Sequence, residues 1–167
     1  PEIAEKVQTI ENILPSKLIV KQSCLKQDDM RSDNAISLLS IGRFCEAKNF
    51  DNIPDICRRI VRFGLNVKWY LIGYGGDEEL IRQKIAENGM QERVIVLGKK
   101  NNPYPYMRAC DLYVQPSRYE GKAVTVREAQ LLGKPVVITK YATSSSQVED
   151  NIDGIIVPMD NAGCAKG

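Results

Sequence analysis

The chain contains no histidine, and this absence excludes several classes of chemistry within it. Ser-His-Asp hydrolysis, Cys-His proteolysis and His-ligated zinc sites all need an imidazole. The five cysteines include no CxxC pair, and their odd number argues against a disulfide framework. We therefore expect free thiols in a reducing compartment, most of them serving as small core residues.

Long apolar runs and a strong charge imbalance are also lacking. No run approaches the ~18 residues of a membrane span, and no signal-peptide pattern opens the chain. The 23 Lys and Arg against 21 Asp and Glu leave a net charge of +2, too close to balance for a general nucleic-acid binder. Three acidic residues, Asp28, Asp29 and Asp33, lack the spacing of a calcium loop, so we predict no metal site.

The remaining composition is that of an ordinary globular domain. With 167 residues, 43% of them hydrophobic and 26% charged, the chain can form one core without a disulfide or metal. Apolar spacing predicts a helix over 1–14, and the run Leu18–Val20 predicts a short strand. Polar residues 26–34 are typical of a linker, whereas the small residues of 159–167 predict no element. The compact domain is thus expected over 35–158.

Within that domain, short apolar runs alternate with amphipathic segments. Such alternation is typical of a doubly wound α/β fold whose parallel sheet is covered on both faces. In this class ligands bind at the carboxyl ends of strands, so we look for chemistry directly after each strand. The predicted strands are 36–41, 67–72, 94–97, 112–114, 136–138 and 155–157, and the predicted helices are 53–62, 79–87, 105–110, 122–132 and 145–150.

Two cations follow the first predicted strand. Arg43 comes directly after Gly42, and Lys48 lies five residues later, just before a helix. Arginine offers a planar fork for phosphate oxygens and lysine a mobile point charge, so the two suit a diphosphate at a helix amino end. The pair is equally compatible with two solvated surface cations, and the pattern alone leaves both interpretations open.

Two acidic residues flank the helix after the fourth strand. Glu120 and Glu128 would lie at most about 12 Å apart on a helix, too far for the ~5 Å pair of a retaining glycosidase. The spacing suits carboxylates that bind hydroxyls at opposite ends of one extended ligand; an exposed loop residue and a salt-bridged helix residue would fit it as well. Gly121 frees the backbone between them, where three amides would point outward at the helix start. These amides belong to Lys122, Ala123 and Val124.

Three further segments have competing interpretations. Gly73–Glu79 lacks dinucleotide or P-loop spacing, so we predict a tight turn with Asp77 as a helix cap. Lys99–Tyr106 is either a proline-rich connector or a segment that contacts a base. The helix cations are either a solvated face or a contact with anionic lipid. The cations concerned are Arg58, Arg59 and Arg62.

Seven motifs, taken in order, resemble the carboxyl-terminal, nucleotide-sugar donor-binding domain of the group 1 retaining GT-B glycosyltransferases (family four). The resemblance covers about residues 36–158, and it implies a Rossmann-like half of a GT-B fold. One departure stands out, because the usual Glu-Gly-Phe-Gly becomes Glu-Gly-Lys-Ala here. The motifs are Gly42-Arg43 with Lys48, Val94–Gly98, Pro103–Tyr106, Ala109–Leu112, Pro116–Gly121, Glu128-Ala129 and Gly133–Val137.

The resemblance implies a role for each candidate residue. Arg43 and Lys48 would neutralise the donor diphosphate without a metal or cofactor, Glu128 would bind the ribose, and Glu120 would hold a hydroxyl of the transferred sugar. Backbone groups after Gly121 would contact sugar and phosphate. A last segment would cradle the base, and it consists of Gly98, Lys99 and Lys100.

The parent enzyme implied by the resemblance transfers a hexose from a nucleotide diphosphate sugar, with a UDP-sugar as the expected donor. The acceptor would be a saccharide or a lipid-linked saccharide, and the reaction would belong to bacterial surface polysaccharide synthesis. The enzyme would be cytoplasmic, or in peripheral contact with the inner face of the membrane. Residues 1–34 would end the acceptor domain and 159–167 would be a truncated tail, so we expect the chain alone to be inactive. A nucleotide-sugar epimerase half-domain and a non-catalytic nucleotide- or partner-binding module remain the alternatives.

Overall fold

Six strands form one sheet at the centre of the computed structural model, which describes residues 13–30 and 34–167. The strands are β1 (Ile36–Arg43), β2 (Val67–Tyr74), β3 (Val94–Gly98), β4 (Leu112–Gln115), β5 (Val136–Thr139) and β6 (Ile155–Val157). Their order is β3-β2-β1-β4-β5-β6, and every neighbouring pair is parallel. The predicted doubly wound α/β fold is confirmed.

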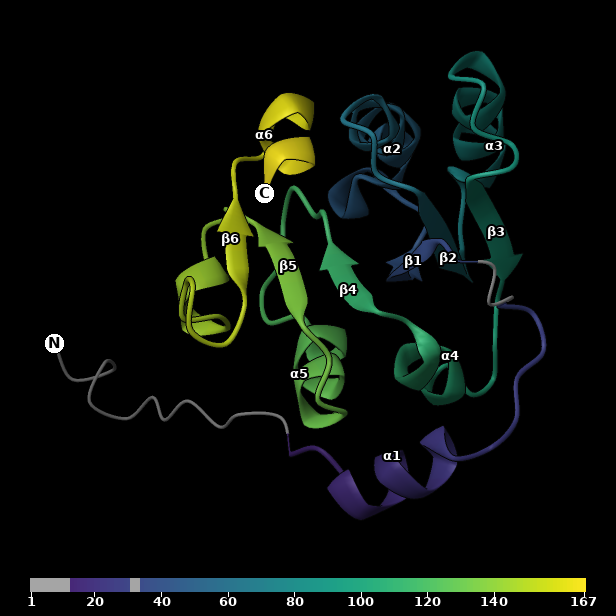
Figure 1. Cartoon of the computed structure of the whole chain (residues 1–167). Helices are drawn as coiled ribbons and strands as arrows, with labels where there is room; N and C mark the ends of the chain where they lie inside the picture. Colours follow the sequence, from purple (N-terminus) through teal and green to yellow (C-terminus); the bar gives the residue numbers. More distant parts are fainter. Residues whose placement is uncertain (1–12, 31–33) are drawn as a thin grey trace, which may run out of the picture.

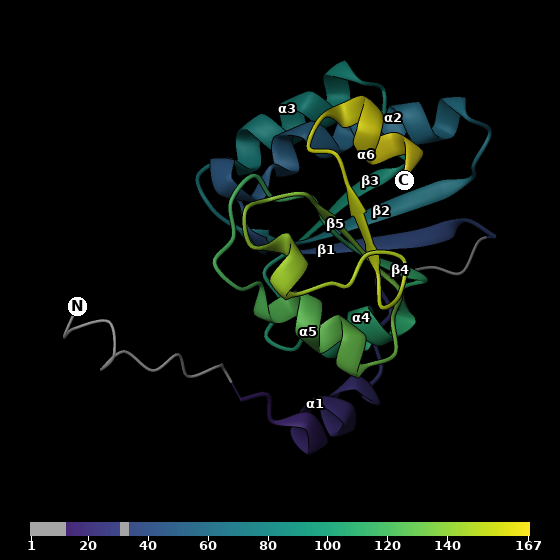
Figure 2. The ribbon, with the colours of Figure 1, turned by 90° about the vertical axis from the view of Figure 1, so that its left-hand side faces the viewer.

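Helices cover both faces of this sheet (Figures 1 and 2). One face carries α2 (Ile53–Arg62), α3 (Glu78–Glu87) and α6 (Asn161–Lys166). The other carries α4 (Tyr104–Ala109) and α5 (Val124–Leu131), with α1 (Ser16–Ser23) packed on the outside of α4. Three short 3-10 helices complete the chain: η2 (Glu46–Lys48), η3 (Phe50–Asn52) and η4 (Ser144–Ser146).

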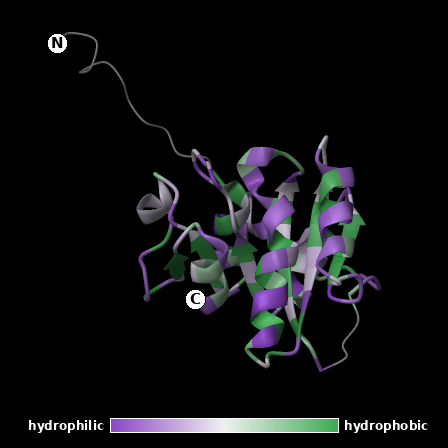
Figure 3. Cartoon of the chain, turned by 90° about the horizontal axis from the view of Figure 1, so that it is seen from above, coloured by the Kyte–Doolittle hydropathy of each residue, from purple (hydrophilic) through white to green (hydrophobic). Residues whose placement is uncertain are grey.

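The apolar strands supply the side chains of two cores, one on each face. In β2, Trp69 and Leu71 belong to the core under α2 and α3, whereas Tyr70 and Ile72 belong to the core over α4 and α5. Successive side chains of a strand point to opposite faces, so a strand buried on both sides is apolar throughout. Figure 3 shows this contrast, with hydrophobic colour along the strands and mixed colour on the helices.

The strand order places a crevice between β1 and β4. The chain leaves β1 toward β2 on one side, and it later returns to β4 on the other side. Loops leaving the carboxyl ends of two such strands separate from each other, and the gap between them is where parallel sheets bind ligands. The segments that border this crevice are 44–52, after β1, and 116–123, after β4.

Several sequence predictions about the chain ends need correction. Leu18–Val20 is part of helix α1 rather than a strand, because only Ile19 and Ser23, four residues apart, are buried. A three-residue apolar run cannot distinguish the two states. The helix expected over 1–14 lies almost wholly outside the described residues.

The expected absence of structure after 159 is also wrong. Asp160 caps helix α6 by accepting a hydrogen bond from the Gly163 amide at 2.8 Å. The helix packs on α2, where Asn161 donates to Asp55 at 3.0 Å and Ala165 is buried. Among its small residues, Gly163 is held against Pro158, where an added Cβ would lie 2.5 Å from the proline Cβ.

Other boundaries shift by less. Helix α5 begins at Val124 instead of Lys122, and the turn of helix expected over 145–150 is the 3-10 turn η4, at Ser144–Ser146. All five cysteines are free, as predicted, but only Cys57 and Cys110 are buried, so most are not core residues. Within the described ranges, none of the helices has the length and apolar character needed to cross a bilayer.

Glycines permit the ends of β1 and β2 to lie against each other. A Cβ added at Gly73 would lie 1.9 Å from the carbonyl oxygen of Gly42. One added at Gly75, which has a φ of +155°, would lie 2.2 Å from the carbonyl oxygen of Phe44. This is the predicted tight turn, although β2 extends through Tyr74. Asp77 does occupy the cap position of α3, but its side chain makes no capping hydrogen bond.

We predict that Gly73→Ala destabilises the protein by about 3 kcal/mol or more, because the added methyl group meets backbone that cannot rotate away. Urea denaturation followed by the fluorescence of the buried Trp69 measures the change. Gly76→Ala is the matched control, since a Cβ there would meet nothing within 4 Å. Equal free energies of unfolding for the two variants would contradict the prediction.

Candidate functional site

A lysine and a glutamate from the two sides of the crevice form an ion pair. Lys48 Nζ lies 2.5 Å from Glu120 Oε1. The Lys48 side chain is 23% exposed and that of Glu120 only 8%. The two residues are 72 positions apart, and the switch from β1 to β4 is what brings them together. The structure therefore places two of the predicted site residues in direct contact.

Backbone and side-chain contacts clamp the two segments that carry this pair. The amides of Arg118 and Tyr119 donate to the Ala47 carbonyl at 2.9 and 3.3 Å. Asn49 adopts a left-handed conformation (φ 61°), and its side-chain amide donates to the Pro116 carbonyl at 2.8 Å. Arg118 also makes a two-pronged ion pair with Asp51, at 3.0 and 2.9 Å.

Glu120 presents its two carboxylate oxygens differently. Oε1 accepts three hydrogen bonds, from Lys48 at 2.5 Å, Ser117 at 2.7 Å and Gln115 at 3.1 Å. Ser117 and Gln115 are both 0% exposed. Among the described residues, none donates a hydrogen bond to Oε2. The second oxygen is thus the one that can accept from a ligand.

Glu128 lies in the second half of α5 and is half-buried. The hydroxyl of Tyr104, at the start of α4, donates to Glu128 Oε1 at 2.9 Å. Burial raises the pKa of Glu128, and the hydrogen bond from Tyr104 offsets part of that rise. Burial and the neighbouring Glu128 charge likewise raise the pKa of Tyr104 to about 12. Tyr104 is therefore neutral near neutral pH and acts as the hydrogen-bond donor.

The two glutamates converge on the same buried tyrosine. Burial, with the negative charges of Glu128 and Glu120, raises the pKa of Tyr113 well above its usual value. Tyr113 is 0% exposed and lies on β4, so the charges of both glutamates act on one buried hydroxyl.

A cavity of about 280 Å³ lies at the carboxyl ends of β1, β2 and β3, and neither Lys48 nor Glu120 is among the residues that line it. Arg43, Lys99 and Lys100 all line it. Gly42, also in the lining, packs against the Lys48 stem, where an added Cβ would lie 3.4 Å from Lys48 Cδ. Cations around one hollow create a positive potential that favours an anionic ligand such as a phosphate.

The two cavity lysines are held in place by aromatic rings and an acid. Lys99 Nζ lies 5.0 Å from the ring centroid of Tyr74. Lys100 Nζ pairs with Asp29 Oδ2 at 2.7 Å and lies 5.5 Å from the ring centroid of Tyr106. The Tyr106 hydroxyl donates to the same Asp29 oxygen at 2.5 Å. The Lys99–Tyr106 segment is therefore more than a connector, because it forms one wall of the cavity.

The expectation of three outward-facing amides after Gly121 is wrong at Ala123. Its amide donates to Gln147 Oε1 at 2.9 Å, and the residue is 5% exposed. Because α5 starts two residues later than predicted, Ala123 turns into the protein instead of toward the crevice. At Gly121 an added Cβ would meet nothing within 4 Å, so the loop is open on that side.

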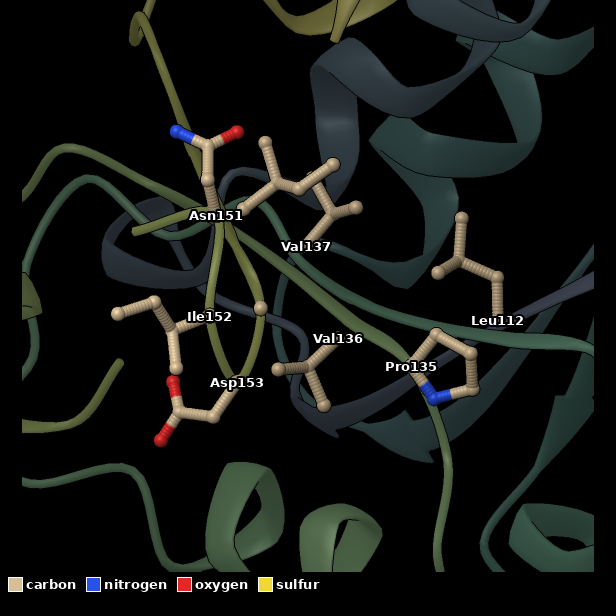
Figure 4. A pocket seen from close by; sticks show the side chains of 9 residues that line it. Leu112, Pro135, Val136, Val137, Asn151, Ile152 and Asp153 are labelled. Carbon is tan, nitrogen blue, oxygen red and sulfur yellow. The ribbon is translucent and has the colours of Figure 1, made fainter. Parts of the chain in front are cut away.

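Two other features lie away from the crevice. A hollow of about 370 Å³, shown in Figure 4, is lined by Pro135, Val136 and Asn151 near the amino ends of β5 and β6, the end of a parallel sheet that does not bind ligands. On α2, Arg58 and Arg59 pair with Asp55 at 2.5 and 2.8 Å. Burial opposes ionisation of Asp55, but hydrogen bonds from these arginines hold its pKa below the usual value. These contacts favour a salt-bridged helix face.

Sequence reasoning missed the residues that orient the two glutamates. Gln115 and Tyr104 contact Glu120 and Glu128 directly. A signal for Gln115 was available, since it is a polar residue closing the otherwise apolar strand Leu112–Gln115. Tyr104 carried no such signal, because its partner lies 24 positions away on another helix.

Comparison with known proteins identifies relatives that match most of the chain. The family "Glycosyl transferases group 1" matches residues 25–164. The N-acetylgalactosamine-N,N'-diacetylbacillosaminyl-diphospho-undecaprenol 4-alpha-N-acetylgalactosaminyltransferase of Campylobacter jejuni is 29% identical over 125 residues, covering 74% of this chain and 33% of the relative. The amylovoran biosynthesis glycosyltransferase of Erwinia amylovora is 27% identical over 168 residues, covering 95% of this chain and 40% of the relative.

A solved structure shows the same fold. HepE of Anabaena, in complex with UDP and glucose, superposes with a TM-score of 0.73 at 26% identity, over 80% of this chain and 37% of that one. The chain thus spans well under half of the length of these three relatives. Neither alternative left open by the sequence, an epimerase half-domain or a non-catalytic module, is favoured by these matches.

We predict that Tyr104→Phe raises the pKa of Glu128 further, because it removes the hydrogen bond that lowers it. Since the folded-state pKa lies above the unfolded value of 4.5, stability is lost as the pH rises from that value through the folded pKa, and the variant should lose more stability over this rise than wild type does. Carbon-13 NMR titration of the Glu128 carboxyl measures the pKa. Tyr119→Phe, at a residue 68% exposed, serves as the control. An unchanged or lower Glu128 pKa in Tyr104→Phe would contradict the prediction.

Proposed function

Because the chain belongs to the group 1 glycosyl transferases, we propose that it holds the nucleotide-sugar donor of a retaining hexosyltransferase. The observation that carries this proposal is the Lys48–Glu120 pair, whose lysine stem lies against Gly42, a residue that also lines the cavity with Arg43. A nucleotide sugar needs cations at its diphosphate and acceptors at its hydroxyls. Residues of both kinds follow the carboxyl ends of β1 and β4.

Each end of the donor has a matching group. Arg43 and Lys48 bind the diphosphate, and Oε2 of Glu120 accepts from a hydroxyl of the transferred sugar. Glu128 accepts from the ribose hydroxyls, since a carboxylate suits a vicinal diol. The base lies along Gly98–Lys100, where Gly98 turns the chain with a φ of +71°. HepE, a structural relative, was solved with UDP and glucose, which supports a UDP-hexose as the donor.

In the transfer step, the bond between the anomeric carbon and the diphosphate oxygen breaks, and a bond from that carbon to an acceptor hydroxyl oxygen forms on the same face. The hydroxyl proton passes to the departing phosphate. Negative charge grows on the diphosphate as the bond breaks, and Arg43 and Lys48 stabilise it. Preorganised charge of this kind lowers the barrier without a protein nucleophile.

We further propose a saccharide or lipid-linked saccharide as the acceptor, in bacterial surface polysaccharide synthesis at the cytoplasmic face of the membrane. The printed names of two relatives, one acting on a diphospho-undecaprenol and one in amylovoran biosynthesis, support this. Acceptor contacts would come from outside the chain. The 167-residue chain should then bind donor but transfer no sugar.

The first test of this function is nucleotide binding. We predict that UDP stabilises the chain by about 2.7 kcal/mol at 100 times its dissociation constant. Thermal shift and calorimetry with UDP, GDP and ADP measure the effect and identify the base. Arg43→Ala should weaken UDP binding, whereas Arg62→Ala on the distant helix α2 should not. Failure of all three nucleotides to bind would refute the donor-domain function.

A second test isolates the ribose contact. Wild type should bind UDP about tenfold or more tightly than 2′-deoxy-UDP, because one hydrogen bond to a charged carboxylate is lost with the hydroxyl. In Glu128→Gln this preference should fall sharply, while the affinity for 2′-deoxy-UDP stays close to that of wild type. Calorimetric titrations of both nucleotides against both proteins provide the comparison. An equal preference in the variant would remove Glu128 from the ribose site.

A further inference from the structure

The amide of Gln115 is the centre of a buried hydrogen-bond network at the end of β4. Its Oε1 accepts from the Tyr113 hydroxyl at 2.7 Å and from Thr125 Oγ1 at 3.3 Å. Its Nε2 donates to Ser117 Oγ at 2.9 Å and to Glu120 Oε1 at 3.1 Å. A side-chain amide has two donor hydrogens and two acceptor lone pairs, so every position is used.

This network permits only one orientation of the amide. Turning it by 180° would bring the carbonyl oxygen of Gln115 to the place of Nε2, 3.1 Å from the Glu120 carboxylate, where two acceptors repel each other. Rotating it out of the network would leave several polar groups without partners in a site where Gln115 is 0% exposed. The chemistry of its neighbours therefore fixes the amide.

A fixed amide in turn fixes Glu120. Gln115, Ser117 and Lys48 together direct three donors at Oε1, which sets the rotation of the carboxylate and leaves Oε2 as the available oxygen. The network also reaches α5 through Thr125, three residues before Glu128. One side chain thus bonds both to Glu120 and to the helix that carries Glu128.

We propose that Gln115 is a positioning residue that sets donor-sugar recognition by orienting Glu120, an inference that rests on the proposed function. Gln115 does not touch the donor. It acts through Glu120, so its loss removes the contribution of the transferred sugar to binding and leaves that of the nucleotide. A merely structural role predicts something different, namely lower stability with equal losses for nucleotide and nucleotide sugar.

The test uses Gln115→Met, which keeps the length and volume of the side chain and removes its hydrogen bonds. Calorimetry on the 167-residue chain compares UDP with the tightest-binding member of UDP-glucose, UDP-galactose and UDP-N-acetylglucosamine. We expect affinity for the UDP-sugar to fall about tenfold, the value of one hydrogen bond to a charged group, and affinity for UDP to stay within about twofold. Gln115→Glu should lose more, because it places a second carboxylate against Glu120.

The matched control is Gln130→Met on the same helix as Glu128. Gln130 is half-buried, and its amide makes one long contact, at 3.5 Å to the Gln147 carbonyl. The Gln130→Met variant should bind UDP and the UDP-sugar as tightly as wild type does. A folded Gln115→Met chain that keeps the wild-type ratio of UDP-sugar to UDP affinity would overturn the proposal.

A second readout needs no ligand. Nitrogen-15 NMR of the Lys48 ammonium reports its pairing with Glu120, and its protons should exchange with water faster in Gln115→Met than in wild type. If wild type binds no nucleotide at all, the proposed function fails. In that case the Lys48 measurement still decides the positioning of Glu120 by Gln115. Ammonium protons that exchange with water at the wild-type rate in Gln115→Met would refute it, and faster exchange in that variant would support it.

Discussion

The ion pair between Lys48 and Glu120 is the contact on which the rest of the site depends. Its partners come from the segments after β1 and β4, the two strands between which the sheet order reverses. Neither segment has a long helix to hold it in place. They hold each other, through the Ala47 carbonyl, the Asn49 amide and the Arg118–Asp51 pair. The two segments that border the crevice are therefore joined directly to each other by hydrogen bonds and an ion pair.

The burial of Glu120 explains why so many polar groups gather there. A carboxylate only 8% exposed has lost most of its water, and an isolated charge at that depth would be strongly unfavourable. Three donors on one oxygen replace the lost hydration. Such a pair adds little net stability, but it leaves the group ready to bind without further reorganisation. At Glu128 the single bond from Tyr104 compensates less, and the pKa of that carboxyl stays raised.

The sequence was sufficient for the fold and for bringing Lys48 and Glu120 to the same sheet edge, and insufficient for the contacts around them. Largely apolar runs such as Val67–Ile72 predict a strand buried on both faces. Parallel sheets bind ligands at the carboxyl ends of their strands, and this rule points to the residues that follow β1 and β4, namely Arg43, Lys48 and Glu120. The roles of these residues toward a donor remain predictions. Helix α6 and the inward turn of Ala123 depend on packing against α2 and Gln147, which no local pattern encodes. The same holds for Tyr104, whose partner is set by how two helices meet.

Asp29 has a consequence for how the protein can be divided. It lies before β1, outside the 35–158 segment that the sequence marks as compact, yet its carboxylate is the counter-ion of Lys100 and the acceptor for Tyr106. A shortened version starting at residue 35 would keep all six strands and lose this acid, along with the buried Ile19 of α1. The cavity would then carry one more uncompensated positive charge. The cavity and the charges that balance it consequently depend on a longer stretch of chain than the sheet does.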